Sequence, residues 1–486
     1  MEKFKFECKR YLHTLGIGEL RAYGRHIGVE RPTTKNKDEL IDSIVGVLCG
    51  EIPAVPCSKL GAPVLNNHIN PEIPEVINRY HVLYVNNWHV TPASPDLKPV
   101  DERIKEFRAS GQGLLRVQSS ASSKRVAMDG KVYRGQVETL NSVTLLLPLD
   151  CIEEGRKIVF PMEILNEYDV KEGDVVDCHV EVGESCNIAR DVLAINGIPV
   201  ERFRRNSFQN SDVCFPSQRI PMKPVAEFTK FLQWIMPIGK GQRALVSAAP
   251  KAGKTHLLQE LAQAVKDNDK LEVIALLVDQ SPETVTAYRK VVNKDNLLFT
   301  TYDHDPDRQV FVAEYALKRA KSFVESGQDV LLILDSFNAF ARAYNDTDLS
   351  SGGKMLACGL ESKTVQYLKK YFGAARCIEN GGSLTIVGAI TAGTGNPADE
   401  YLAAELSALS NWTLYLDEKL AYKRIYPALN MEKFYANANV ALLSNEERAS
   451  AVMFYERYAV QKDVEGALQL LRSESYSDFA EKLLNQ

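Results

Sequence analysis

The sequence predicts an α/β domain with a mainly parallel sheet, preceded by a small β-barrel of the OB type and an N-terminal helical module. Three observations support this prediction. Strand-like apolar runs alternate with helical segments after Pro224. Short runs of alternating polarity, broken by Gly and Asp, fill residues 101–200. Apolar residues recur at helical spacing within residues 1–50.

Composition places the chain among ordinary globular proteins. Its 486 residues suffice for roughly three domains. The net charge of −5 is only a weak argument against nucleic-acid binding, because a local basic groove can lie on an acidic protein. The charged start MEKFKFECKR is not a secretory signal, and no apolar run approaches the ~18 residues of a membrane span. The nine cysteines form no CxxC pair and favour reduced thiols, so we expect a cytoplasmic protein with no membrane partner.

Residues 1–50 are predicted to form a helical module. Leu12, Leu15, Leu20, Tyr23 and Ile27 fall at helical spacing, and KNKDELIDSIVGVL predicts a second amphipathic helix. The pattern LxxYGRxxGV…KNKDELI resembles helical modules of the SAP or Rho-N type, which often bind nucleic acid; a generic helical hairpin fits the pattern about equally well. Residues 51–100 are rich in Pro and Asn and predict a linker, in which HVLYVNNWHV could form one strand.

The remaining chain divides into a barrel, an α/β domain and a tail. The runs GQGLLRVQ, KIVFPMEIL, GDVVDCHVEV and VLAINGI predict the barrel over residues 101–200, with 119–141 as an inserted loop or hairpin. The runs ALVSAA, VIALLVD, VLLILDS and SLTIVGAI predict parallel strands within 207–445. Residues 446–486 predict a helical tail.

ALVSAAPKAGKTHLLQELAQAV is the most informative segment, because a strand leads through a loop into a helix. Backbone N–H groups and the helix dipole at such a helix start favour an anion, so AGKT predicts a phosphate-binding loop. Gly253 would let the backbone approach phosphate, Lys254 would reach the β- and γ-phosphates, and the Thr255 hydroxyl would ligate Mg²⁺. The predicted nucleotide-binding residues of this segment are Ala249, Pro250, Lys251, Ala252, Gly253, Lys254, Thr255 and His256.

Two further strand ends bear on the chemistry. DVLLILDS ends a buried strand in Asp335, where a Walker B carboxylate holds Mg²⁺. An Asp that only caps the next helix is the alternative, and the GKT segment favours the metal. LLVDQSPETV leaves its apolar run with Asp279 and Gln280. A nucleotide hydrolase often places a water-activating carboxylate just past such a strand, and here an amide follows Asp279, so hydrolysis is in question.

Residues 207–486 resemble the bacterial transcription termination factor Rho family. PIGKGQR, APKAGKT, LDS…ARAYN, YFGAARCIENGGSLTI and KRIYPAL occur in the family's order, and the family's phosphate loop also lacks the first Gly of GxxxxGK[ST]. The N-terminal module and the OB-type segment fit the family's layout more loosely. The resemblance implies a RecA-like P-loop motor domain in a six-membered ring, with ATP between subunits and RNA in the central hole.

The resemblance also assigns binding residues. Tyr426 falls where the family stacks an aromatic on adenine, although a core aromatic is the alternative. Lys354, beside Gly353, falls in a pore loop that contacts RNA. Leu114 and Arg116 fall in the family's GFGFLR stacking motif, which reads GQGLLR here. Both stacking aromatics are missing, and stacking is worth ~1–3 kcal/mol per base.

Several positions depart from the family. Gln280 occupies the place of its catalytic glutamate, and Ser281 replaces an arginine of the same segment. An amide can orient water but cannot accept its proton, and a general base typically contributes ~10²–10⁴-fold in rate. The arginine-finger position falls near Asn437, Ala339 stands where the family has another arginine, and Pro397 replaces a pore-loop lysine.

The positions that would hold the nucleotide match the family, and these are Lys254, Thr255, Asp335 and Tyr426, whereas the positions that would drive hydrolysis are replaced. We therefore expect an ATP- and RNA-binding translocase or helicase of transcription termination with weakened hydrolysis, in which Lys254, Asp335 and the substituted Gln280 form the catalytic set. It would form a homo-hexamer or a mixed ring with another Rho, and RNA polymerase is a further candidate partner. A catalytically poor paralogue with a regulatory or structural role, and a nucleotide-gated adaptor, are left open. The basic pairs Lys124–Arg125 and Arg204–Arg205 could add RNA contacts, but we expect solvated charge at both.

Overall fold

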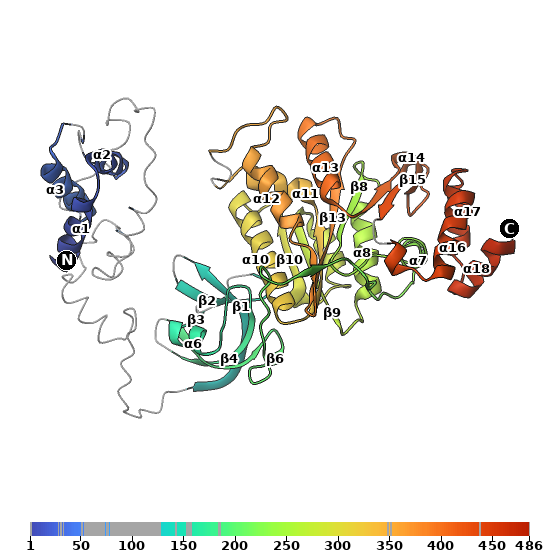
Figure 1. The fold of residues 1–486 in the computed structure, drawn as a ribbon, viewed down its shortest axis with the longest axis horizontal. Coiled ribbons are helices and arrows are strands. Elements are labelled where there is room, and N and C mark those ends of the chain that lie inside the picture. The colour runs from blue at the N-terminus through green and yellow to red at the C-terminus, as the bar shows by residue number, and fades with distance from the viewer. Residues whose placement is uncertain are drawn as a thin grey trace. The chain divides into compact units, whose positions relative to one another are not determined.

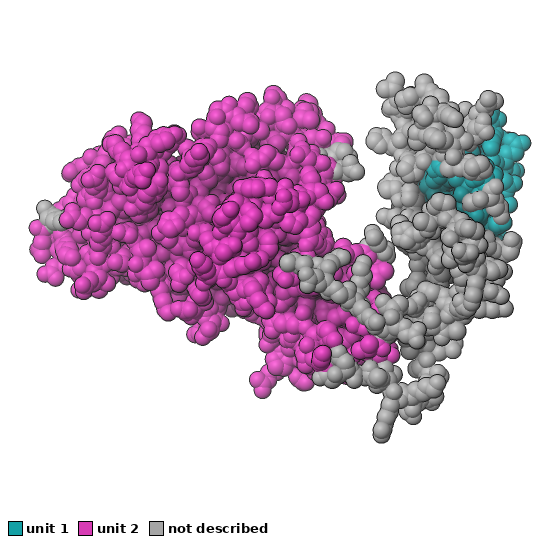
Figure 2. Space-filling view, turned by 180° about the vertical axis from the view of Figure 1, so that it is seen from behind, with its two compact units in different colours: residues 1–123 teal, residues 124–486 magenta. Residues whose placement is uncertain are grey.

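The computed structural model describes two compact units, Met1–Ser123 and Lys124–Gln486 (Figure 2). The described residues are 2–27, 29, 32, 34–49, 52, 73, 77, 128–140, 143–151, 158–182, 186–347, 349, 352–436 and 439–485. The strand considered at 81–90 and most of the expected linker lie outside them. Within the described part, none of the helices combines the length and apolarity that a bilayer crossing requires.

Within the described residues of the first unit, the helices with given bounds are α1 (Glu2–Thr14), α2 (Ile17–His26) and α3 (Lys37–Leu48) (Figure 1). Helix α3 begins at a capping box, in which Glu39 N–H donates to Asn36 Oδ1 at 2.9 Å and Asn36 N–H donates to Glu39 Oε2 at 3.2 Å. Leu12, Leu20 and Tyr23 are buried in the small core, as their helical spacing predicts. Leu15 and Ile27 are only partly buried against it.

The second unit begins with a six-stranded sheet. Its strands are β1 (Met128–Leu140), β2 (Val143–Leu147), β3 (Ile158–Val159), β4 (Val175–Glu181), β5 (Asn187–Ile195) and β6 (Ile198–Pro199), with helix α6 (Met162–Glu167) between β3 and β4. The order is β3-β2-β1-β4-β5-β6, and a further parallel pairing of β3 with β5 closes the sheet on itself. The inside is apolar, with Val137, Val176 and Cys178 among its buried residues.

The prediction that 119–141 is an insertion is wrong for its described part, although that part does form a hairpin with β2. Residues 128–140 form β1, which pairs with β2 on one side and β4 on the other. The strand was missed because Gln136 and Glu138 interrupt its apolar pattern, yet both are buried. Their partners are Arg319 and Lys318, which lie more than 170 residues downstream.

Helix α10 (Pro306–Glu325) carries the polar groups that hold the barrel on the α/β domain. Arg319 is fully buried; its Nε donates to Gln136 Oε1 at 2.7 Å. The Asn196 amide donates to Ser322 Oγ at 2.8 Å. Buried polar groups need hydrogen-bond partners, and these side chains of α10 find theirs in the barrel.

The expectation of solvated charge at Arg204–Arg205 is wrong for Arg205. Its side chain is buried and its Nη2 lies 2.6 Å from Asp174 Oδ2, a carboxylate that is itself fully buried. Its Nη1 lies 3.0 Å from Glu325 Oε2 on α10. Arg205 therefore joins the barrel to the α/β domain and is not available for RNA. Lys124 and Arg125 lie outside the described residues.

The α/β domain is built on a mainly parallel sheet, as predicted. Its strands are β7 (Val213–Cys214), β8 (Arg243–Ala248), β9 (Leu271–Gln280), β10 (Leu297–Thr301), β11 (Asp329–Asp335), β12 (Arg376–Ile378), β13 (Ser383–Thr391), β14 (Trp412–Leu416) and β15 (Leu429–Ala436). The main order is β10-β9-β11-β13-β8-β14-β15, parallel from β10 to β14. The four strands predicted from sequence are the central ones β8, β9, β11 and β13.

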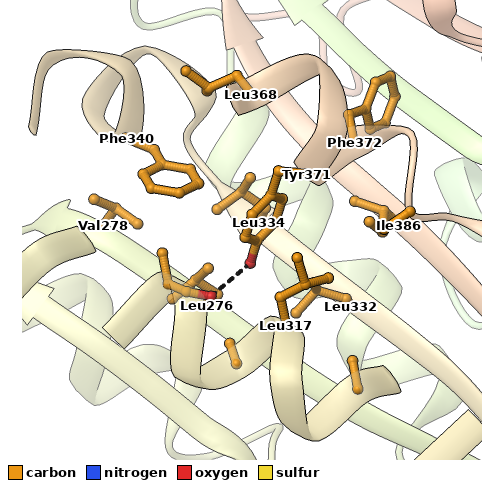
Figure 3. Close-up of a cluster of buried hydrophobic side chains, with 14 of the residues drawn as sticks. Leu276, Val278, Leu317, Leu332, Leu334, Phe340, Leu368, Tyr371, Phe372 and Ile386 are labelled. Atoms are coloured by element: carbon orange, nitrogen blue, oxygen red, sulfur yellow. Dashed lines mark hydrogen bonds between the residues drawn. The ribbon is translucent and has the colours of Figure 1, made fainter. Parts of the chain in front are cut away.

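Helices cover both faces of this sheet (Figure 1). They are α7 (Glu227–Trp234), α8 (Lys254–Val265), α9 (Pro282–Tyr288), η2 (Lys294–Asn296), α10, α11 (Phe337–Asn345), α12 (Ser362–Phe372), α13 (Pro397–Leu409), α14 (Glu418–Tyr422) and α15 (Asn439–Leu442). Along β9, Leu276 and Val278 enter one core, while Ala275 and Leu277 enter the other. Figure 3 shows the first core, where the Tyr371 hydroxyl donates to the carbonyl of Ala313 at 3.0 Å.

The expected helical tail consists of α16 (Asn445–Phe454), a π-helical turn (Tyr455–Ala459), α17 (Val464–Leu471) and α18 (Tyr476–Asn485). These helices share the second core with α7. The rings of Trp234 and Phe479 lie 5.1 Å apart, and Phe454 packs on both Phe231 and Phe479. The tail is thus part of the α/β domain's packing.

Candidate nucleotide-binding site

The residues predicted to bind nucleotide meet at one edge of the central sheet. Strands β9, β11, β13 and β8 are neighbours, and they end at Gln280, Asp335, Thr391 and Ala248 respectively. Because all four are parallel, these ends lie at the same edge. In open α/β sheets, ligands bind outside this carboxyl edge.

The loop after β8 has the backbone of an anion site. Gly253 adopts φ +98°, which favours glycine, and α8 begins at the next residue. The first N–H groups of a helix have no partner within it, so this end can receive an anion. Lys254 Nζ donates to the carbonyls of Ala249 and Ala248 at 3.1 and 3.3 Å. Burial lowers the pKa of Lys254, and the charges of Asp335 and Asp399 oppose this effect.

Asp335 lies beside this loop at the end of β11. Its side chain is buried, with 2% of the residue exposed. Burial raises the pKa of Asp335, while a hydrogen bond with Thr255 and the charge of Lys254 lower it. The Oδ2 atom has no hydrogen-bond partner in the described part of the chain. A buried, unpartnered carboxylate oxygen next to a threonine hydroxyl fits a hard cation such as Mg²⁺.

Gln280 lies at the same edge, one strand away from Asp335. Its Nε2 donates to the carbonyl oxygens of Asp335 and Val278, both at 3.4 Å. Asp279 adopts φ +55°, and its N–H donates to Thr300 Oγ1 at 3.1 Å. Ser281 caps α9, accepting from Thr284 N–H. A carboxamide therefore occupies the position next to the buried Asp335, and it cannot take a proton from water.

Tyr426 lies against the phosphate loop although it lies 173 positions after Gly253 in the sequence. A Cβ placed on Gly253 would lie 3.6 Å from Tyr426 Cε1 and 3.7 Å from its Cδ1. About half of the tyrosine, 49%, is exposed. The alternative of a core aromatic is therefore wrong, because a core ring would be buried. An exposed ring beside a phosphate loop can stack on a base.

Lys251 and His256 belong to the same loop and helix as Gly253 and Lys254, whereas Gly353 and Lys354 lie in another loop. Lys251 is exposed, and His256 pairs with Glu260 at 3.1 Å on the surface of α8. Gly353 and Lys354 lie in the loop between α11 and α12, where Gly353 N–H donates to Glu361 and Lys354 N–H donates to Ser362. The Lys354 side chain is exposed. Leu114, Arg116 and Asn437 lie outside the described residues.

Sequence reasoning missed a polar pair at the end of β13. Asn338 on α11 donates to Asp399 Oδ1 at 2.7 Å and accepts from Thr391 N–H at 2.7 Å. Asp399 also accepts from Thr394 Oγ1 at 3.1 Å, and its charge acts on Lys254. The segment GTGNPADE carries a signal for this pair, an Asn-Pro helix start followed by acidic residues.

Comparisons with known proteins match this architecture. A family model described as the ATP synthase alpha/beta family, nucleotide-binding domain, matches residues 229–435. The chain is 37% identical over 273 residues to the transcription termination factor Rho of Karelsulcia muelleri (strain SMDSEM), covering 54% of this chain and 72% of that relative. It is 36% identical over 353 residues to the Rho of Mycobacterium tuberculosis (strain ATCC 25618 / H37Rv), covering 70% of this chain but only 58% of that relative.

Among solved structures, the chain is similar to the assembled ATPase EscN from the enteropathogenic E. coli type III secretion system. The TM-score is 0.49 at 16% sequence identity, and the match covers 72% of this chain and 99% of that chain. A likeness of this degree carries no argument about function or assembly. The sequence matches and the parallel sheet together define a RecA-like P-loop nucleotide-binding domain.

Proposed function

Because the chain belongs to the transcription termination factor Rho family, we propose that it binds ATP and RNA in transcription termination and hydrolyses ATP only slowly. The observation that carries the slow step is the carboxamide of Gln280 beside Asp335. The phosphate loop that leads through Gly253 into α8, which matches the family's, supports tight nucleotide binding. Binding and turnover are thus proposed to be uncoupled in this chain.

Each residue of the site would have one part in binding. Lys254 and the first N–H groups of α8 would hold the phosphates, and Tyr426 would stack on the adenine. Thr255 and Asp335 would hold Mg²⁺, which when bound neutralises phosphate charge. Gln280 would orient a water molecule without removing its proton, because an amide has no basic oxygen at neutral pH. The water would therefore attack slowly.

RNA binding and ring formation are the parts of the proposal that rest on the family. Members of the family as named are transcription termination factors, and a six-membered ring would place the exposed Lys354 in the loop that faces RNA. The closed β-sheet of residues 128–199 would be an OB-type RNA-binding domain, and the N-terminal helical module a further nucleic-acid contact. RNA polymerase would be the partner on which termination acts.

The experiment that tests the proposal measures binding and turnover on the same protein. We expect Mg²⁺·ATP to bind, while RNA-stimulated turnover stays below about 0.1 s⁻¹, some 10²-fold under the ~10 s⁻¹ typical of enzymes. Gln280→Glu is expected to raise turnover no more than about tenfold, because the carboxylate loses both donations that orient Gln280. Gln280→Met, which has neither a base nor a donor, is the matched control.

Wild-type turnover of one per second or faster that Lys254→Ala abolishes would contradict weak hydrolysis. Absence of Mg²⁺·ATP binding would contradict the whole proposal. Gel filtration with ATP and RNA tests the ring separately, and a monomer under all conditions would exclude it.

Tyr426→Ala is expected to weaken ATP binding by roughly two- to tenfold, since aromatic stacking contributes about 0.5–1.5 kcal/mol. Tyr426→Phe should keep the affinity, because the ring and not the hydroxyl faces Gly253. Tyr422→Ala, at an exposed tyrosine whose hydroxyl donates to Glu418, is the control and should have no effect. Fluorescent-nucleotide titration measures all three, and equal affinity of Tyr426→Ala and wild type would exclude stacking.

A further inference from the structure

The connector between the barrel and the α/β domain, residues 204–226, joins the large sheet through β7. Two cysteines lie opposite each other at this point. Strand β7 of the connector pairs antiparallel with β12, and the register places Cys214 directly across from Cys377. The ladder continues with Glu379 N–H donating to the carbonyl of Asp212 at 2.9 Å. Residues that face each other in an antiparallel pair have Cα atoms ~4.5–5.5 Å apart, within the ~4.4–6.8 Å range of disulfides.

The Cys214 thiol points toward the backbone of Cys377. Cys214 Sγ donates to the carbonyl oxygen of Cys377 at 3.7 Å. Both cysteines are partly exposed. Side chains alternate between the two faces of a sheet, and the neighbours Val213 and Phe215 are 58% and 90% exposed, so Cys214 points to the opposite, more covered face.

We propose that Cys214 and Cys377 form a reversible disulfide when the protein meets a peroxide. The Cys214 thiolate attacks one peroxide oxygen, which breaks the O–O bond and gives a sulfenic acid and one water when the oxidant is hydrogen peroxide. The Cys377 sulfur then attacks the sulfenic sulfur, forming the S–S bond and releasing a second water. Two thiols are oxidised by two electrons in total, and one hydrogen peroxide is reduced to two waters.

The order of the two steps follows from the surroundings of Cys377. Burial raises the pKa of Cys377 to about 12, and the hydrogen bond with Cys214 acts in the same direction. The backbone of Gly241 also packs on Cys377, since a Cβ on this glycine would lie 2.8 Å from Cys377 Cβ. Cys377 is therefore a poor nucleophile toward peroxide, so Cys214 reacts first and Cys377 loses its proton only as its sulfur attacks the neighbouring sulfenic acid.

The bond would fix the connector to the sheet without reaching the nucleotide site. Strand β12 pairs with the amino end of β13, where Cys377 lies across from Ser383. The phosphate loop lies at the carboxyl edge, past Thr391 at the other end of the same strand. Oxidation is thus expected to slow opening of residues 204–226 and to leave ATP affinity unchanged within about twofold.

The test is peptide mapping of the full-length wild type before and after a stoichiometric dose of hydrogen peroxide, with free thiols alkylated and no reducing agent. We expect one linked peptide pair containing Cys214 and Cys377, loss of two free thiols per chain, and full return with dithiothreitol. Cys358→Ser, at a partly exposed cysteine in the loop between α11 and α12, is the matched control and should keep the cross-link. Cys214→Ser should abolish the cross-link and leave Cys377 free to alkylation.

Three results would overturn the proposal. One is independent oxidation of Cys214 and Cys377 to sulfinic acids with no linked pair. Another is a cross-link that uses Cys57 or Cys358 in place of this pair. The last is a linked pair whose formation leaves hydrogen exchange of residues 204–226 unchanged, which would remove the proposed effect on the connector. None of these measurements depends on ATP turnover, so the proposal and the proposed function fail separately.

Discussion

Replacing Lys254 by alanine is expected to weaken ATP binding at least about 100-fold. Hydrogen bonds to charged groups contribute ~1.5–3 kcal/mol each, so loss of two phosphate contacts amounts to about 3 kcal/mol. The ammonium group is already at the sheet edge, held by the carbonyls of Ala248 and Ala249. Its charge also lowers the pKa of the buried Asp335, so the variant loses part of the field that keeps that carboxylate ionised.

Calorimetric titration with Mg²⁺·ATP measures this effect, and the melting temperature of the unliganded protein shows whether the variant is folded. Lys266→Ala is the matched control, because Lys266 caps the far end of the same helix and donates to the carbonyl of Lys290. It should bind ATP like wild type. A folded Lys254→Ala protein with affinity within threefold of wild type would contradict the assignment of the phosphate loop.

The part of the site that the sequence could predict is the part with local signals. The four central strands are continuous apolar runs. Lys254 follows β8 after a short loop, so the sequence alone places it at the end of that strand. Asp335 and Gln280 are the last residues of two others, so the parallel order alone brings them together. Tyr426 is different, because no local pattern points to it: the family resemblance implied its stacking role, and its place beside Gly253 is visible only in the structure.

The part that could not be predicted depends on partners far away in sequence. Gln136 in β1 looked like a loop residue because its partner Arg319 lies on a helix of another domain. Arg205 looked like surface charge because nothing near it in sequence reveals Asp174 and Glu325. Polar residues at such positions break the apolar periodicity on which strand prediction depends, and tertiary contacts alone make them compatible with burial.

Arg319→Met is expected to destabilise the second unit by about 3–5 kcal/mol. The guanidinium is completely buried, and it donates to Gln136 Oε1 at 2.7 Å and to the carbonyls of Asp295 and Leu149 at 2.6 Å each. Methionine fills much of the volume but donates nothing, so three acceptors, two of them buried, lose their partner at ~1–3 kcal/mol each, partly relieved by relaxation. Unfolding in guanidinium chloride, monitored by circular dichroism, measures the loss in free energy of unfolding.

The comparison that isolates the interface is a double-mutant cycle. In the double variant Gln136→Met/Arg319→Met, the acceptor Gln136 Oε1 is removed along with its donor. The loss of stability of the double variant should therefore be smaller than the sum of the two single losses by ~0.5–3 kcal/mol. Arg472→Met is the matched control, since that arginine is 68% exposed in its ion pair with Glu227 and should cost no more than about 1 kcal/mol. If Arg319→Met cost no more than this control, the buried guanidinium would not hold the barrel, and the coupling of the barrel to α10 would have to come from Arg205 and Asn196 instead.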